Sequence, residues 1–241
     1  AVTCDDFAQA IADANPASDL ARLLPQFKRW YSQAGTPRVA AQGVYDAGAN
    51  TYALTLSQSC APTTGQASKE PFVIPVALGL LGADGHDMAL QVAGDNTEEA
   101  TCRTLVLTQA TETFTFTGIT SAPVPSILRG FTAPVVLDFD YTDAQLLHLL
   151  AHDSDPFNRW EAGQRLAVTS ALNAIQSGAA YTGNTGATAS NDVLNEAYLA
   201  AMRQVLHDPA LDAAFKELVL TLPSETYLAE QLDVVDPQQI H

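Results

Sequence analysis

The chain has 241 residues and a formal net charge of −16, with 11 lysines and arginines against 27 aspartates and glutamates. Binding to a nucleic acid or to an anionic membrane requires a basic surface, and the longest cationic run is the pair Lys28-Arg29, so we expect neither partner. Apolar residues make up 47% of the chain and charged residues 16%, which is the composition of a globular protein rather than a disordered one.

The first segment, residues 1–36, has a helical pattern. Thr3 followed by Asp6 predicts a capping box at the start of a helix. Phe7 and Ile11 lie four residues apart, and therefore on one face of that helix. Two short helices cannot bury their apolar faces against each other alone, so we expect this segment to be the end of a larger domain.

The stretch FKRWYSQAGTPRV marks the end of the helical segment. Its two cations suit the carboxyl end of a helix, Gly35 suits a C-terminal cap, and Pro37 cannot continue a helix. Trp30 and Tyr31 stand immediately before a strand-like pattern. We therefore expect both aromatic side chains to rest on the domain that follows.

Residues 37–141 change to a period of two, which is typical of strands with one solvent-exposed face. Asp84-Gly85 predicts a hairpin turn between two of these strands. About seven such runs, separated by Gly, Pro and Asn, predict an antiparallel β-sandwich of immunoglobulin-like size. The clearest alternating positions are Tyr52, Leu54 and Leu56; Phe114 and Phe116; and Val135, Leu137 and Phe139.

Residues 142–241 return to a helical pattern. Thr142 and Gln145 predict a capping box. The dipeptide Asp-Pro predicts further helix starts, because the aspartate can cap the helix and proline tolerates its first position. It occurs at Asp155-Pro156, Asp208-Pro209 and Asp236-Pro237. Few residues follow the third dipeptide, so we expect the helical domain to be truncated.

Two apolar stripes at helical spacing predict the buried faces of this domain. Between them, SGAAYTGNTGATAS at residues 177–190 predicts a flexible loop. The pattern favours antiparallel helical hairpins, the opening turns of a helical solenoid. The stripes are Trp160, Gly163, Ala167, Ala171 and Ala174, and Leu211, Phe215, Leu218 and Leu222.

One segment, HLLAH, resembles a metal motif. His148 and His152 lie four residues apart, which is a spacing used by zinc ligands. In the His-Glu-x-x-His peptidases, the residue after the first histidine is the glutamate that takes the proton of the attacking water, and here it is Leu149. We interpret the pair as two ordinary histidines on a helix.

No other motif offers a credible active site. The chain has no Gly-x-Ser-x-Gly and no Gly-x-x-x-x-Gly-Lys. Carboxylate pairs such as Asp5-Asp6 and Glu98-Glu99 stand in polar surroundings, where neither gains the raised pKa that general acid catalysis needs. The residues therefore predict no catalytic, metal-binding or substrate-binding position.

The cysteines indicate the cellular compartment of the protein, and the first residues indicate whether the sequence belongs to a longer protein. Cys4, Cys60 and Cys102 are odd in number and widely spaced, which predicts buried free thiols in a reducing, cytoplasmic compartment. No apolar run approaches the roughly 20 residues that a membrane span needs. The first residue is not methionine, and the start has no signal-peptide pattern, so we expect the sequence to begin inside a longer protein.

The order of these segments resembles the region after the catalytic domain in bacterial zinc aminopeptidase N, a gluzincin metallopeptidase. The resemblance extends in family order over essentially all 241 residues. It rests on AVTCDDF, FKRWYSQAGTP, YALTLSQ, PVPSILRGFTAPV and HDSDPFNRWEAGQ.

The resemblance implies a multidomain α and β fold. Residues 1–36 would be the helical tail of a missing catalytic domain, residues 37–141 an immunoglobulin-like β-sandwich, and residues 142–241 the start of a helical domain of armadillo-like hairpins. The family's His-Glu-x-x-His helix, its Gly-Ala-Met-Glu-Asn loop and its oxyanion tyrosine have no counterpart here. No functional residue is carried over.

The resulting hypothesis is a non-catalytic structural fragment that braces or encloses the catalytic domain. Its partner would be the rest of the same polypeptide, which would hold the zinc cofactor and cleave N-terminal residues from peptides. This fragment alone would hold no cofactor and would be inactive. Two alternatives stay open: a free-standing sandwich-plus-helices module that binds a protein partner, and a small hydrolase that uses His148 and His152.

Overall fold

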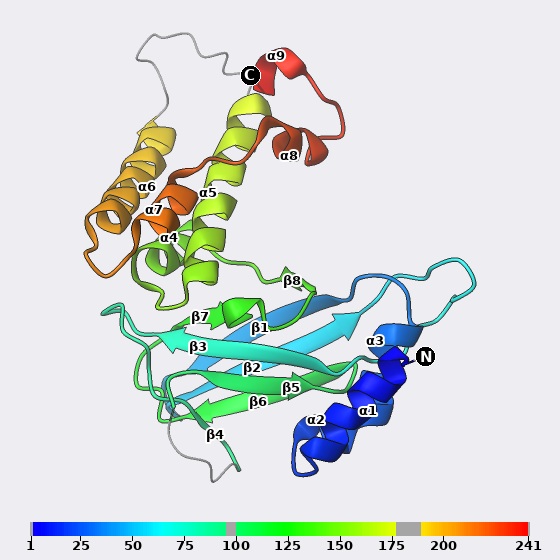
Figure 1. Ribbon diagram of the computed structural model, residues 1–241. Helices are drawn as coiled ribbons and strands as arrows, with labels where there is room; N and C mark the ends of the chain where they lie inside the picture. The colour runs from blue at the N-terminus through cyan, green and yellow to red at the C-terminus, as the bar shows by residue number, and fades with distance from the viewer. Residues whose placement is uncertain (1, 95–99, 177–188, 241) are drawn as a thin grey trace. The chain divides into compact units, whose positions relative to one another are not determined.

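The computed structural model describes residues 2–94, 100–176 and 189–240 (Figure 1). Its contacts divide the chain into two compact units. Unit 1 comprises Ala1–Leu80 and Met88–Asp140, and unit 2 comprises Leu81–Asp87 and Tyr141–His241. Among the described residues, no helix combines the length and the apolar character that crossing a bilayer requires.

Unit 1 contains the predicted β-sandwich. One sheet has the strand order β4-β6-β2-β1-β8 and the other has the order β5-β3-β7. The strands are β1 (Arg38–Asp46), β2 (Thr51–Ser59), β3 (Ile74–Leu81), β4 (Gln91–Val92), β5 (Arg103–Leu107), β6 (Thr111–Thr117), β7 (Val124–Ile127) and β8 (Val136–Asp138). A short 3₁₀ turn, η1 (Arg129–Phe131), separates β7 from β8.

The core lies between the two sheets, and the period-two pattern places it there. Tyr52, Leu54 and Leu56 of β2 are buried, as predicted, together with Phe116 of β6. The opposite face of the same strands is polar: Thr55 Oγ1 lies 2.9 Å from Thr113 Oγ1. Alternation therefore sets which face of β2 and β6 meets the core.

Two details of the sheets differ from the prediction. Strand β8 pairs with β1 in parallel, because the two strands are far apart in the sequence and no tight turn joins them. The Asp84-Gly85 turn exists, with Gly85 at φ +80°, but the bridge beyond it joins only Leu81 to Asp87. After this turn the chain leaves β3, and β4 pairs with β6 of the other sheet.

A close backbone approach in unit 1 requires glycine. Gly79 in β3 lies under the buried guanidinium of Arg129, and a Cβ at this glycine would be 2.0 Å from Arg129 Cζ. The same guanidinium donates from Nε to the buried Ser126 Oγ at 2.9 Å. A larger residue at position 79 would displace this side chain.

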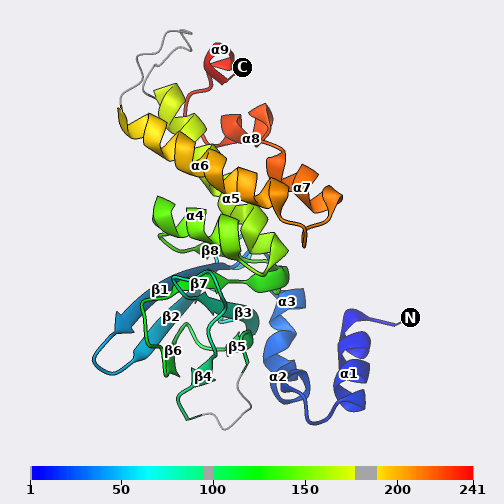
Figure 2. The same cartoon turned by 90° about the vertical axis from the view of Figure 1, so that its left-hand side faces the viewer.

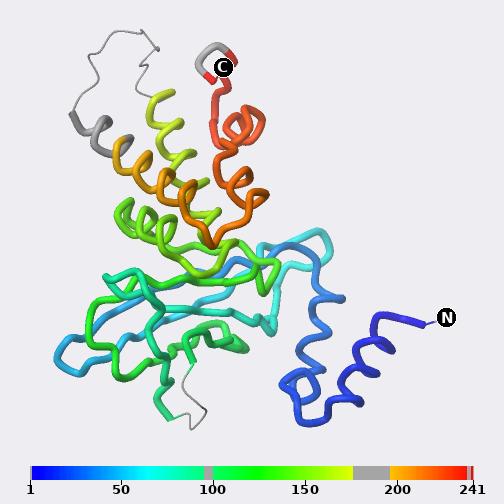
Figure 3. Tube along the Cα trace, turned by 60° about the vertical axis from the view of Figure 1, so that its left-hand side comes forward, coloured from blue at the N-terminus to red at the C-terminus, as the bar shows by residue number. Residues whose placement is uncertain are grey.

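The N-terminal helices form a small hairpin of their own. They are α1 (Cys4–Ala14), α2 (Asp19–Phe27) and α3 (Arg29–Ser32). The capping box at Thr3 and Asp6 is confirmed. Figures 2 and 3 show α2 and α3 adjoining the sheets of unit 1, with α1 on the outer side. Ala8, Ala12 and Leu24 make up the buried centre of the hairpin.

The junction at α3 attaches this hairpin to the sandwich. Trp30 packs against the sandwich core and donates from Nε1 to Val73 O at 2.8 Å, and its ring centroid lies 4.8 Å from that of Phe72, with the two planes tilted by 48°. This confirms the prediction for Trp30. The prediction for Tyr31 is wrong: its side chain is 49% exposed, and its ring lies 6.0 Å from that of Phe27 in an edge-to-face arrangement.

Unit 2 is helical, as predicted. Its helices are α4 (Asp143–His152), α5 (Pro156–Gln176), α6 (Ala189–His207), α7 (Ala213–Leu220), α8 (Glu225–Glu230) and α9 (Pro237–Ile240). The capping box before α4 is confirmed, and two of the three Asp-Pro dipeptides precede helices. Asp208-Pro209 does not, since Asp208 Oδ1 instead accepts from Ala210 N, and α7 is capped by Asp212.

The predicted stripes are largely wrong. Helix α5 buries Arg159, Ala162, Gly163 and Leu166, so only Gly163 of the first stripe belongs to its buried face. A search for apolar residues at helical spacing could not identify Arg159 as part of the buried face, because arginine is charged. In the second stripe Leu218 is 51% exposed and Leu222 67% exposed, whereas Val219 is buried.

Of the predicted loop 177–190, residues 177–188 lie outside the described residues and 189–190 begin α6.

Candidate functional site

The histidine pair of the HLLAH segment lies on α4, within unit 2. The two imidazole centroids are 5.0 Å apart, so the helix does bring the rings together. His148 is half-buried, and its Nε2 donates to Gly82 O at 2.9 Å. This bond commits one ring nitrogen to the backbone of the turn between β3 and Met88.

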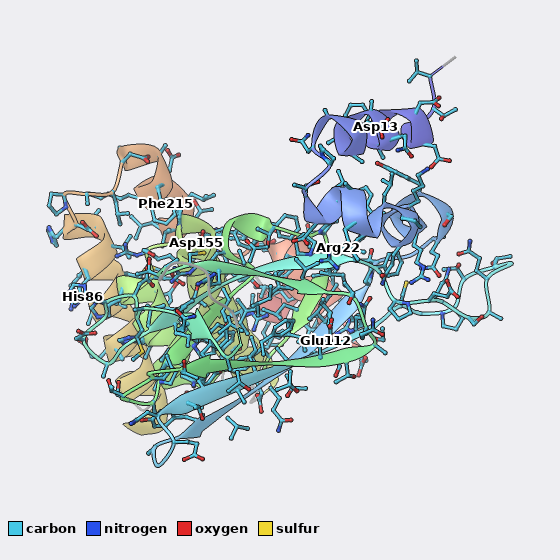
Figure 4. The ribbon with its side chains drawn as sticks, turned by 90° about the horizontal axis from the view of Figure 1, so that it is seen from below. Asp13, Arg22, His86, Glu112, Asp155 and Phe215 are labelled. Atoms are coloured by element: carbon cyan, nitrogen blue, oxygen red, sulfur yellow. The ribbon has the colours of Figure 1, made fainter. Side chains whose placement is uncertain are left out.

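Three basic side chains lie near His152. Burial, followed by the neighbouring His148, Arg159 and His86, lowers its pKa below the ordinary value of 6.5. His86, labelled in Figure 4, belongs to the same turn and its side chain is exposed.

These residues do not fit a zinc site. Catalytic zinc takes three protein ligands and an open position. Among the residues that the structure describes, no group of three or more His, Cys, Asp and Glu side chains could hold a metal ion. His148 is also occupied by Gly82 O. The histidine pair therefore has no arrangement that would activate a water molecule.

Arg159, a buried arginine that the sequence did not predict, links several segments of unit 2. Arg159 Nε donates to Leu150 O and its Nη2 donates to Ala151 O, both at 2.8 Å. Its Nη2 also lies 3.4 Å from Asp208 Oδ2. The side chain thus satisfies the last carbonyls of α4 and ties them to the chain after α6. No sequence signal pointed to it, because an arginine in an amphipathic helix is expected on the exposed face.

The remaining candidates have structural roles. The Asp6 carboxylate accepts from Thr3, whose backbone and hydroxyl hydrogen bonds lower the pKa of Asp6. Glu98-Glu99 lies outside the described residues. The prediction of buried thiols is wrong, because Cys4 and Cys102 are exposed and Cys60 is only half-buried. The number and spacing of the cysteines, on which the prediction rested, do not determine whether a thiol is buried.

A pocket of about 110 Å³ lies beside Cys60, and the lysine that lines it is already hydrogen-bonded within the chain. Lys69 lines this pocket, and its ammonium donates to Ala34 O at 2.8 Å, to Thr63 Oγ1 at 2.7 Å and to Gln66 Oε1. The three donors of the ammonium are thereby used within the chain. We assign no ligand to it.

Exposed apolar side chains are the more informative feature of the surface. Phe7 is 61% exposed and Ile11 38% exposed on α1; we call these two side chains the α1 apolar face. Asp13 on α1 and Arg22 on α2, labelled in Figure 4, mark the same two helices. Unit 2 exposes Leu218, Leu220 and Leu222 in and after α7.

Comparison with known families divides the chain into two matched regions. Residues 35–140 match a domain of unknown function with an Ig-like fold, DUF3458. Residues 143–241 match DUF3458_C, a domain of unknown function with ARM repeats. These descriptions agree with the predicted sandwich and armadillo-like hairpins.

Relatives match the chain from end to end. Aminopeptidase N of Escherichia coli K12 is 38% identical over 239 residues, which is 98% of this chain and 25% of that protein. Aminopeptidase N of Caulobacter vibrioides is 40% identical over 241 residues, with 100% of this chain and 25% of that protein covered. The chain thus spans about a quarter of the length of these relatives.

A solved structure shares the fold. The crystal structure of Legionella pneumophila aminopeptidase A in complex with aspartic acid superimposes with a TM-score of 0.73 at 24% identity. The match covers 100% of this chain and 24% of that one. Both units therefore have counterparts within one longer chain.

Proposed function

We propose that this chain, whose residues 35–140 match the DUF3458 Ig-like domain and residues 143–241 the DUF3458_C ARM-repeat domain, is a non-catalytic quarter of a zinc aminopeptidase N. The observation that carries the proposal is the end-to-end match to aminopeptidase N of Escherichia coli, of which the chain covers only 25%. In this proposal the activity belongs to the longer polypeptide, which removes N-terminal residues from peptides in the cytoplasm.

The distribution of apolar surface supports the assignment. Phe7 and Ile11 project from a hairpin whose buried centre consists of two alanines and one leucine. Burying such a side chain contributes about 1.5–3 kcal/mol, so leaving both exposed forgoes stability that a neighbouring domain would restore. We assign residues 1–36 to the end of the catalytic domain, and the α1 apolar face to contact with the rest of that domain.

The two following parts would brace the catalytic domain. Residues 37–141 form the sandwich, to which Trp30 fastens the end of the catalytic domain. Residues 142–241 form the start of the helical domain, in which the exposed leucines around α7 would contact further helices. The longer polypeptide supplies the partner for both surfaces.

The chemistry would lie outside this chain. Zinc in the longer protein would activate the attacking water, and its ligands and glutamate base would come from the part that this chain does not cover. In this proposal no residue of the chain contacts zinc or peptide. His148 and His152 are structural.

Metal content and activity test the proposal. The 241-residue chain and the longer polypeptide from the same gene are dialysed, analysed for zinc and assayed with chromogenic alanyl and arginyl anilides. We expect zinc and turnover in the longer polypeptide alone. One tightly bound zinc per 241-residue chain, together with measurable turnover, would overturn the proposal and favour a hydrolase that uses the histidine pair.

A further inference from the structure

The segment Glu70–Val73 lies between β2 and β3 and outside both strands, and side chains of the N-terminal helices bind its main chain; we call it the acceptor segment. Pro71 O accepts a hydrogen bond of 2.5 Å from Arg29 Nη1. Val73 O accepts one of 2.8 Å from Trp30 Nε1. Main-chain carbonyls that no strand pairs thus find their partners in side chains.

Two glutamines extend this contact. Gln26 Nε2 donates to Pro71 O at 3.2 Å and to Thr108 O at 2.6 Å. Gln33 binds Glu70 twice, since Gln33 Nε2 donates to Glu70 O at 2.9 Å and Gln33 Oε1 accepts from Glu70 N at 2.7 Å. The amide of Gln33 therefore supplies the pair of hydrogen bonds that a residue of a neighbouring strand would otherwise supply.

The four side chains that bind the acceptor segment lie on one face of a helical run. Gln26, Arg29, Trp30 and Gln33 follow the spacing i, i+3, i+4, i+7. Only Lys28 separates α2 from α3, and its backbone is right-handed helical, so this face continues from one helix into the other. Helices that dock in a groove of a partner protein bind it through the same spacing.

The sandwich in turn binds the main chain at the end of α3. Gln66 Nε2 donates to Ser32 O at 2.7 Å, and Gln66 Oε1 accepts from Ala34 N at 2.8 Å. Lys69 Nζ donates to Ala34 O at 2.8 Å. Each side of the contact therefore uses its side chains to bind main-chain groups of the other side.

The sandwich itself holds the acceptor segment in place. Phe72, at its centre, is 2% exposed and belongs to the sandwich core. Gln58 of β2 binds both main-chain groups of Phe72, accepting from Phe72 N at 2.7 Å and donating to Phe72 O at 2.9 Å. The acceptor segment is thus positioned by contacts other than those with the helices, as a preformed binding site would be.

We propose that the acceptor segment is a docking site for a helix, and that residues 26–34 occupy it as a ligand that stays bound when the covalent link to the sandwich is cut. The ligand class is a helix that carries hydrogen-bond donors at the four positions above, one of them aromatic. The docking is independent of the aminopeptidase assignment. Its role in the longer polypeptide rests on the proposed function: there the site would hold the end of the catalytic domain on the sandwich.

Cutting the link tests the docking in the 241-residue chain. A recognition sequence for a specific protease is inserted between Gly35 and Thr36, which are both exposed, and a fluorescent label is attached to the N-terminus. After cleavage in native buffer, we expect residues 1–35 and 36–241 to elute together from a size-exclusion column and to separate in urea. Fluorescence anisotropy during dilution of the cut protein then gives the dissociation constant.

Two variants remove contacts from opposite sides of the site. Gln33→Ala removes both hydrogen bonds to the main chain of Glu70 and should raise the dissociation constant about tenfold. Gln66→Ala removes the bonds to Ser32 and Ala34 and should raise it by a similar factor. Far-ultraviolet circular dichroism before cleavage checks that each variant is folded.

Two controls separate main-chain binding from other contacts. Gln9→Ala lies in the same cut segment, but the amide of Gln9 donates to Asp13 on its own helix, so the dissociation constant should not change. Glu70→Gln keeps the main-chain groups that Gln33 binds and removes only an exposed ion pair with Arg29. It should therefore raise the dissociation constant only about two- to threefold.

Three results would overturn the proposal. The first is separate elution of the two pieces after cleavage in native buffer. The second is an unchanged dissociation constant in either Gln33→Ala or Gln66→Ala. The third is a loss of affinity in Gln9→Ala as large as that in Gln33→Ala, which would place the binding at α1. Since none of these readings involves zinc or turnover, they are distinct from a failure of the proposed function.

Discussion

Replacing Trp30 by alanine tests how the N-terminal hairpin is attached to the sandwich. The change removes the ring contact with Phe72 and the 2.8 Å hydrogen bond from Nε1 to Val73 O. Truncating a fully buried tryptophan costs about 3–5 kcal/mol, and Trp30 is half-buried but also loses a hydrogen bond, so we expect the free energy of unfolding to fall by about 2–4 kcal/mol.

Urea unfolding followed by far-ultraviolet circular dichroism measures this loss without depending on the removed fluorophore. Trp30→Phe separates the two contributions, since it keeps an aromatic ring and should lose only about 1 kcal/mol for the bond to Val73. Tyr31→Ala is the matched control, because the neighbouring ring is 49% exposed and should cost less than Trp30→Ala. Equal losses for the alanine variants at positions 30 and 31 would refute this account of the junction.

Three further predictions concern stability. Gly79→Ala should lower the free energy of unfolding by about 1–3 kcal/mol by displacing the guanidinium above it, whereas Gly48→Ala, where a Cβ meets only one side-chain oxygen at 3.3 Å, should stay within about 0.5 kcal/mol. Arg159→Met should cost about 2–4 kcal/mol by leaving the last carbonyls of α4 unpaired, and Arg203→Met on the exposed surface of α6 should be nearly neutral in the same urea titration. Deleting residues 1–24 should lower the melting temperature of the sandwich little, because the contacts of Gln26, Arg29 and Trp30 with it remain; a large drop in a calorimetric scan would contradict this.

Local patterns predicted the β-sandwich and the helix starts well. The alternation at Tyr52, Leu54 and Leu56 reflects a simple physical constraint, since one face of a strand must be dry. The capping box at Thr142 and Gln145 is likewise a contact between residues three apart. Features of this kind are visible in sequence because both partners lie within one turn or one strand.

The failures come from contacts between distant residues. Asp208 resembled an N-cap, yet its side chain pairs with Arg159, 49 residues away, and the dipeptide opens no helix. The buried face of α5 was misplaced for the same reason, because a buried arginine looks like a surface residue in an amphipathic pattern. The parallel pairing of β8 with β1 likewise joins two strands that lie at opposite ends of the sandwich sequence.

The histidine pair shows which features of the candidate site could not be predicted from the sequence. Spacing alone indicated that His148 and His152 share one face of a helix, and their rings do lie 5.0 Å apart. It could not show that Gly82 O takes one ring nitrogen, or that His86 and Arg159 are the neighbours of the other histidine. The turn that supplies two of these groups lies more than 60 residues earlier in the chain.

Hydrogen exchange of α1, compared between the 241-residue chain and the longer polypeptide, tests the central claim most directly. If residues 1–36 belong to a catalytic domain, the amides around Phe7 and Ile11 should exchange early in the 241-residue chain and become protected in the longer polypeptide, while those around Trp30 are protected in both. The contrary result is protection at Phe7 and Ile11 equal to that of Leu54 in the 241-residue chain alone, which would make the hairpin part of a self-contained module.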